Sequence, residues 1–89
     1  MLSLEECIGL SGLTDDEVAI IAEHEHVPPI VAAELGSGLL ISSKGLYRLH
    51  MLFRDCLDEA ARKGRRDQEK RIGQVYARFR SQYPMPRML

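Results

Sequence analysis

The sequence predicts an all-α protein: a small bundle of four main helices, preceded by a short N-terminal helix and ending in an antiparallel helical hairpin. Apolar residues recur every three or four positions, which is the period of an amphipathic helix. Helix-capping sequences precede several of these stretches, and no segment carries a strand signal. With 89 residues the chain has room for one domain. We place this domain at residues 1–83, followed by a flexible C-terminal tail at 84–89 that contains two prolines.

Capping boxes mark the first two helices. Residues 3–6 (Ser-Leu-Glu-Glu) place a hydroxyl and, three positions later, a carboxylate, so that each can bond a backbone N–H at the helix start. This short helix is expected to end between Gly9 and Gly12. Residues 14–17 (Thr-Asp-Asp-Glu) repeat the pattern and begin a second helix that extends to about His26.

The third helix is predicted from about Pro29 to Leu40. Pro28 ends the helix before it, and proline is well tolerated in the first turn of the next one because its missing N–H has no partner there. On a helical wheel its apolar residues fall on every side, and only Glu34 and Ser37 are polar. A helix that is apolar all round is either central or part of an interface.

The last two helices have the most regular apolar stripes. Ser42 and Ser43 offer an N-cap for the fourth helix, whose C-terminal end is marked by two bases and then Gly64. Its stripe is formed by Leu46, Leu49, Phe53, Leu57 and Ala60. The stripe of the fifth helix is formed by Ile72, Val75, Tyr76, Phe79 and Tyr83. The connection is so short that the two helices must lie antiparallel.

Composition and cysteine usage predict a cytoplasmic protein with no membrane partner. The acidic first residues lack the basic start of a signal peptide. The longest apolar stretch, residues 27–41, is interrupted by prolines and glycines and is too short to cross a bilayer. Two cysteines do not make a disulfide framework, so Cys7 and Cys56 are expected to be buried thiols in a reducing compartment.

The sequence contains none of the common catalytic patterns. It has no glycine-rich phosphate loop, no nucleophile elbow and no context that would activate a cysteine. A helical chain of 10.1 kDa also has little volume for a pocket of the usual size. We therefore expect no enzymatic activity and no cofactor.

Charge is divided unevenly along the chain. Residues 1–43 contain eight acidic residues and no Lys or Arg, whereas residues 44–89 contain all 12 basic residues and five acidic ones. These two parts, the acidic and basic segments, carry −8 and +7, although the chain as a whole carries −1. Three interpretations follow: the segments meet within one chain, they meet between two copies, or the basic segment binds a charged partner. Within the basic segment, i,i+4 spacing predicts the ion pairs Asp58–Arg62, Glu59–Lys63 and Asp67–Arg71.

Six basic residues gather around the turn between the fourth and fifth helices: Arg62, Lys63, Arg65, Arg66, Lys70 and Arg71. Such a patch can contact phosphates or an acidic protein, so a nucleic-acid accessory protein is one alternative function. The preferred interpretation is a solvated hairpin tip. No tryptophan is present and Tyr76 belongs to an apolar stripe, so surfaces for base stacking are scarce and nucleic acid is not the expected partner.

A metal site is the other alternative. Residues 23–26 read Glu-His-Glu-His, and the spacing of Glu23 and His26 predicts that both side chains lie on one helix face. Carboxylate-bridged di-metal bundles use this spacing, so the implied cofactor is a divalent transition metal, with Glu34 or His50 as further ligands. The competing interpretation is that His26 caps the end of its helix and that His50 is hydrogen-bonded at the boundary of an apolar stripe.

The leading hypothesis is a non-catalytic protein–protein interaction or scaffold module that acts as a homodimer. One small bundle can hardly cover a third helix that is apolar on all sides, and Ile20 points away from the apolar stripe of its own helix. A second copy of the chain is therefore expected to cover part of this surface. The expected interface residues are Ile20, Ile30, Ala33, Leu40 and Tyr47.

Overall fold

Five helices make up most of the chain in the computed structural model, which describes residues 3–87. They are α1 (Leu4–Ser11), α2 (Asp15–Glu25), α3 (Pro29–Leu39), α4 (Ser43–Arg62) and α5 (Arg66–Gln82). Within the described residues there is no strand. The predicted all-α fold is therefore confirmed, and each helix begins and ends close to where the sequence predicts it.

The capping residues explain where the first two helices begin. Thr14 Oγ1 accepts a hydrogen bond from the Glu17 N–H (3.2 Å), and Glu17 Oε1 accepts one from the Thr14 N–H (2.7 Å). This capping box is complete, as predicted. At α1, Ser3 Oγ accepts from the Glu6 N–H (3.2 Å), but the Glu6 carboxylate accepts from the Ser3 hydroxyl (3.1 Å). In the first capping box, therefore, the Ser3 side chain caps the Glu6 N–H, but the Glu6 carboxylate bonds the Ser3 hydroxyl in place of the Ser3 N–H.

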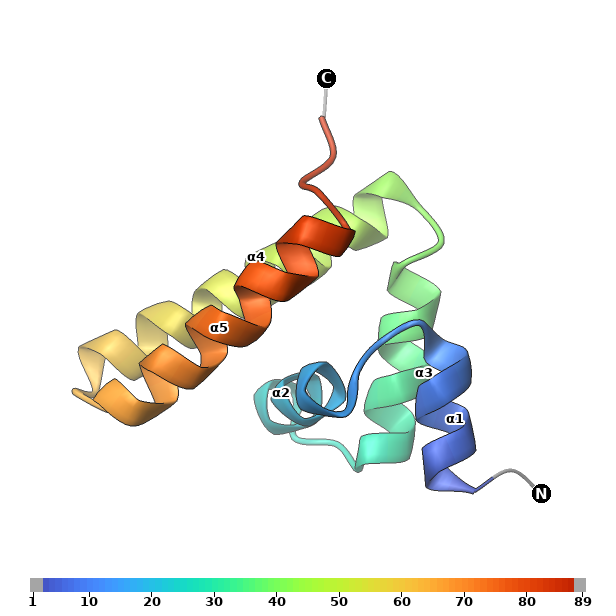
Figure 1. The fold of residues 1–89 in the computed structure, drawn as a ribbon, viewed down its shortest axis with the longest axis horizontal. Coiled ribbons are helices and arrows are strands. Elements are labelled where there is room, and N and C mark those ends of the chain that lie inside the picture. The colour runs from blue at the N-terminus through green and yellow to red at the C-terminus, as the bar shows by residue number, and fades with distance from the viewer. Residues whose placement is uncertain (1–2, 88–89) are drawn as a thin grey trace.

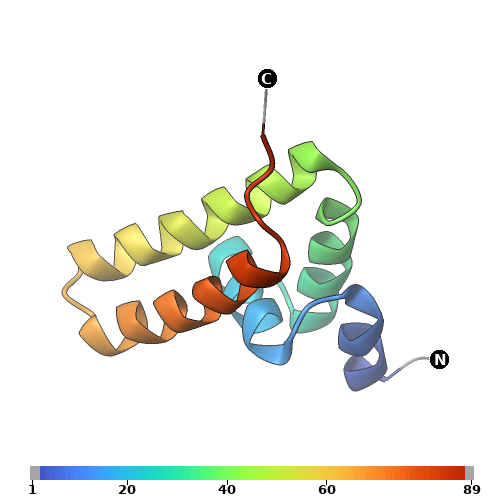
Figure 2. The same ribbon diagram turned by 45° about the horizontal axis from the view of Figure 1, so that its top comes forward.

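The helices form two groups, with α2 lying between them (Figure 1). On one side α1 packs beside α3, and on the other α4 and α5 form the predicted antiparallel hairpin. Helix α2 contacts α3 on one side and both helices of the hairpin on the other. A second view shows the tip of the hairpin extending away from α1 and α3 (Figure 2). The cationic turn between α4 and α5 therefore lies at one end of the molecule.

The core joins α2 and α3 to the hairpin. Its largest fully buried side chains are Phe53, Phe79, Ile21, Leu49, His50 and Val18. Phe53 of α4 and Phe79 of α5 have ring centroids 4.9 Å apart, and Tyr76 stacks on Phe53 at 5.7 Å. These contacts bury the centre of both predicted stripes, which is where the burial of apolar surface stabilises the hairpin.

His50 is fully buried and connects α4 to the end of α5. Its Nδ1 lies 2.9 Å from the Tyr76 hydroxyl, and its Nε2 lies 2.7 Å from the Tyr83 carbonyl oxygen. Because a carbonyl oxygen only accepts, Nε2–H donates to Tyr83 and Nδ1 accepts from the Tyr76 O–H. The Tyr83 hydroxyl in turn donates to the Gly12 carbonyl at 3.0 Å, which ties the end of α5 to the end of α1.

The corner between α3 and α4 depends on a close backbone approach. Ser42 caps α4, because its Oγ accepts a hydrogen bond from the Gly45 N–H (3.0 Å). A Cβ at Gly45 would overlap the Leu39 carbonyl oxygen and would lie 2.8 Å from Leu39 Cα. Only glycine fits this position, which fixes the angle at which α4 leaves α3.

The segment after α5 has no helical structure as far as residue 87. Met85 and Pro86 in this segment are half-buried. Residues 88–89 of the predicted tail and residues 1–2 of the predicted domain lie outside the described residues. None of the helices in the described part of the chain combines the length and apolar composition that crossing a membrane requires.

Candidate functional site

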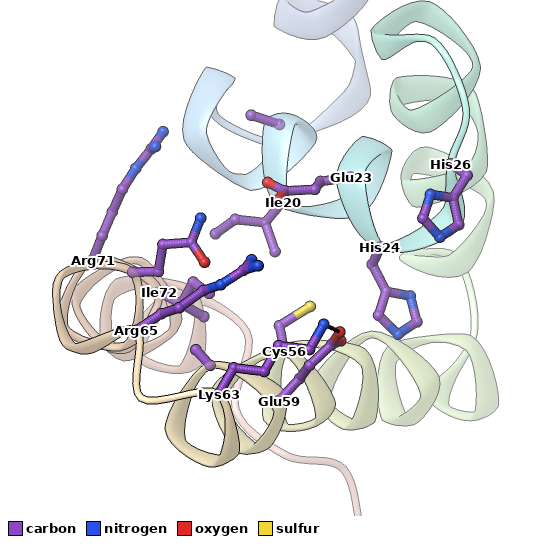
Figure 3. A pocket seen from close by; sticks show the side chains of 13 residues that line it. Ile20, Glu23, His24, His26, Cys56, Glu59, Lys63, Arg65, Arg71 and Ile72 are labelled. Atoms are coloured by element: carbon purple, nitrogen blue, oxygen red, sulfur yellow. Dashed lines mark hydrogen bonds and ion pairs between the residues drawn. The ribbon is translucent and has the colours of Figure 1, made fainter.

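A cleft of about 280 Å³ lies between α2 and the tip of the α4–α5 hairpin (Figure 3). Its α2 wall includes Ile20, Glu23 and His24. The hairpin wall includes Cys56, Glu59 and Lys63 from α4, Arg65 from the turn, and Gln68, Arg71 and Ile72 from α5. The cleft therefore combines apolar side chains with charges of both signs. The α2 wall and the hairpin wall are far apart in sequence, so no local pattern could have predicted the cleft.

Two ion pairs involve residues of the hairpin wall. Lys63 Nζ lies 2.6 Å from Glu59 Oε1, in the predicted i,i+4 pair, and this hydrogen bond holds the pKa of Glu59 below its ordinary value. Arg71 Nη2 lies 3.3 Å from Asp16 Oδ1 of α2. Both pairs are solvent-exposed, so each contributes little to stability.

The charge pairing predicted within the basic segment is only partly right. Arg71 turns to Asp16 of the acidic segment, so the predicted pair with Asp67 is wrong. Asp58 and Arg62 likewise form no ion pair in the described part of the chain. Over residues 3–87, Arg71–Asp16 is the single ion pair between the acidic and basic segments. The division of charge therefore persists on the surface of the folded chain.

Two opposite charges in the cleft have no ion-pair partner among residues 3–87: Arg65 and Glu23. The Arg65 side chain extends into the cleft from the hairpin side, and Glu23 points into it from α2 (Figure 3). On the same α2 wall, His24 Nδ1 is shielded from solvent and makes no hydrogen bond. Its nearest charged atom is Glu25 Oε1, at 3.5 Å.

Cys56 lines the cleft as a protonated thiol. Burial raises its pKa to about 11, and the negative charges of Glu59 and Asp55 act in the same direction. At neutral pH this thiol is neither a nucleophile nor a thiolate ligand. Cys56 and Cys7 are both free and half-buried, whereas the sequence predicted buried thiols.

The structure does not bring the predicted metal ligands together. His26 adopts a left-handed backbone (φ 57°) as the C-cap of α2, and it lines the cleft together with Glu23 (Figure 3). Glu34 is exposed on α3, and His50 uses both ring nitrogens inside the core. Within the described residues no three His, Cys, Asp or Glu side chains are close enough to hold a metal ion.

The five predicted interface residues lie in three different environments. Ile20 and Ala33 are only 7% and 1% exposed, because the hairpin covers α2 while α1 and α2 pack against α3. Neither is available to a second copy. Leu40 is half-buried, whereas Ile30 and Tyr47 are 40% and 38% exposed.

The outer face of α3 is largely apolar. We use this name for the exposed residues Ile30, Val31, Glu34, Leu35 and Gly38. Its three large apolar side chains are each about 40% exposed, and Glu34 is its one charged residue. Sequence analysis named Ile30 but missed Val31 and Leu35, because a helix that is apolar on every side does not reveal which side its neighbours cover.

The six residues of the predicted basic patch, in the last turn of α4, the connecting turn and the first turns of α5, are all exposed. Lys63 and Arg71 are ion-paired, as described above. The other four, Arg62, Arg65, Arg66 and Lys70, have no ion-pair partner among residues 3–87. This distribution fits the solvated tip that the sequence favoured.

No protein-family model matches this chain, and neither a curated protein nor a solved structure shows significant similarity to it. The outer face of α3 and the cleft are therefore the two features from which function is inferred.

Proposed function

We propose that this chain is a non-catalytic protein–protein interaction module that acts as a homodimer, in which the outer face of α3 packs against the same face of a second copy. The observation that carries the proposal is the exposure of Ile30, Val31 and Leu35 side by side on one helix. Large apolar side chains grouped on a surface are typical of association sites.

The shape of the outer face suits a close approach of two helices. Gly38 has no side chain, and a Cβ built there meets open space. Small residues let helix backbones approach closely, while the neighbouring Val31 and Leu35 supply the apolar contact. Glu34 is the one charged residue of this face that pairing would have to accommodate.

Molar mass in solution tests the proposal. Light scattering on a sizing column is expected to give the parent twice the 10.1 kDa chain mass, and to give a Val31→Asp/Leu35→Asp variant the mass of one chain. Gln74→Asp/Ala77→Asp is the matched control, because it adds the same two charges at exposed positions of α5 and should leave the dimer intact. Circular dichroism checks that all three remain folded.

Two results would contradict the proposal. A parent protein that stays monomeric at every concentration tested would exclude a homodimer. A folded double variant with the mass of the parent would show that the two chains meet elsewhere.

A further inference from the structure

The cleft between α2 and the hairpin presents two free charges of opposite sign. Arg65 enters from the hairpin side and Glu23 from α2, yet no ion pair joins them (Figure 3). The neighbouring charges Lys63 and Arg71 already have partners, Glu59 and Asp16. A guanidinium binds a carboxylate through two parallel hydrogen bonds, and a carboxylate accepts readily from an ammonium group. These two unpaired side chains are therefore suited to a ligand that carries one negative and one positive group.

Size and apolar lining narrow the class of ligand. The cleft measures about 280 Å³, slightly below the range of about 300–1,000 Å³ typical of drug-sized ligands. Apolar contact is offered by Ile20 and Ile72 on opposite walls, and by Ala19 and Ala60 beside them. A molecule of amino-acid size with an apolar side chain fits these limits.

We propose that the cleft binds a free α-amino acid with an apolar side chain. Arg65 receives its carboxylate, Glu23 receives its ammonium group, and the side chain lies against Ile20 and Ile72. One chain supplies every one of these residues, and none belongs to the outer face of α3. The inference is therefore independent of the proposed dimer.

Calorimetric titration with a panel of L-leucine, L-methionine and L-phenylalanine tests the ligand class. At least one of the three is expected to bind at millimolar concentration or below. For leucine, two analogues each remove one charge: 4-methylpentanoate lacks the ammonium group, and 3-methylbutylamine lacks the carboxylate. Each is expected to bind at least tenfold more weakly than leucine. A folded protein that binds none of the three amino acids would overturn the proposal, and so would equal binding of leucine and either analogue.

Variants test the assignment of each charge. Arg65→Gln is expected to weaken amino-acid binding at least fivefold while leaving the weak binding of 3-methylbutylamine unchanged. Glu23→Gln is expected to weaken amino-acid binding by a similar factor while sparing 4-methylpentanoate. Arg66→Gln is the matched control, because Arg66 neighbours Arg65 in sequence but does not line the cleft. An equal loss in Arg66→Gln would mean that general charge, and not the cleft, attracts the ligand.

Discussion

At the residue scale, the backbone angle of His26 decides the outcome of the predicted metal site. The spacing of Glu23 and His26 fits one helix face only if the helix continues through both residues. Pro28 prevents this, and the chain turns into the left-handed region at His26, whose N–H bonds the Ala22 carbonyl. The sequence indicated that the helix ended near this point. It did not reveal that the terminal residue would adopt a left-handed backbone.

His50 is the residue at which burial has the clearest consequence for stability. Desolvation lowers its pKa from the ordinary value of 6.5, and the charges of Arg80 and Arg54 act in the same direction, although the bond to Tyr83 opposes them. In the folded protein the ring is therefore held neutral, with one nitrogen donating and the other accepting. Sequence analysis foresaw a hydrogen-bonded histidine, but placed it at the boundary of the core.

Stability is expected to fall as the pH drops below about 6.5, the pKa of histidine in an unfolded chain. Because the folded pKa of His50 is lower, the unfolded chain takes up the proton first, so the contribution of neutral His50 is complete above this pH and is lost progressively below it. The limiting slope for one proton is about 1.4 kcal/mol per pH unit. Urea denaturation between pH 7.5 and 5 measures it. His50→Asn should flatten the slope, and an unchanged slope would assign the effect to other groups.

At the element scale, the existence of each helix was predictable and the environment of each face was not. Capping residues, glycines and 3.6-residue periodicity are local signals, so the hairpin and its stripe through Leu49, Phe53 and Phe79 could be found from sequence. The buried side of α3 depends on α1 and α2, which pack against it from elsewhere in the chain. For the same reason Ala33 proved buried while Val31 remained exposed.

The close backbone approach at the α3–α4 corner predicts opposite effects on stability for two glycine-to-alanine substitutions. Gly45→Ala is expected to destabilise the fold by about 2–3 kcal/mol, because the new Cβ would collide with the backbone of Leu39, which cannot move without displacing α3. Gly73→Ala makes the same change within α5, where the nearest atom, Leu57 Cδ2, would be 3.8 Å away. It is expected to stabilise by about 0.5–1 kcal/mol. Urea midpoints measure both, and a Gly45→Ala variant as stable as the parent would contradict this account.

At the scale of the whole molecule, folding does not neutralise the two charged segments against each other. The exposed Arg71–Asp16 pair is the one ion pair that joins them in residues 3–87. The outer face of α3 lies within the acidic segment, which carries −8. Pairing this face with its copy therefore brings two acidic surfaces together. The uneven charge was evident from sequence, but its arrangement around the apolar face required the fold.

Salt is consequently expected to strengthen the dimer. Raising the ionic strength from about 0.02 M to 0.5 M shortens the screening length to a few ångströms and weakens the repulsion between the acidic segments. Sedimentation equilibrium should show a dissociation constant that decreases with salt, and Glu34→Gln should reduce this dependence. A dimer that instead dissociates at high salt would indicate that the acidic segment of one chain meets the basic segment of the other.

The hydrogen bond from the Tyr83 hydroxyl to the Gly12 carbonyl spans 71 positions of the chain. Contacts of such long sequence separation are costly in entropy to form early in folding. During biosynthesis α1, α2 and α3 emerge before any of α5 exists, and they do so without the ring of Phe79 or the His50 bond to Tyr83. In the nascent N-terminal half, Ile21 and Val18 therefore lack the part of the core that α5 supplies. The hydrogen bond between the two ends of the fold can form only after Tyr83 has left the ribosome and its hydroxyl has reached the carbonyl of Gly12.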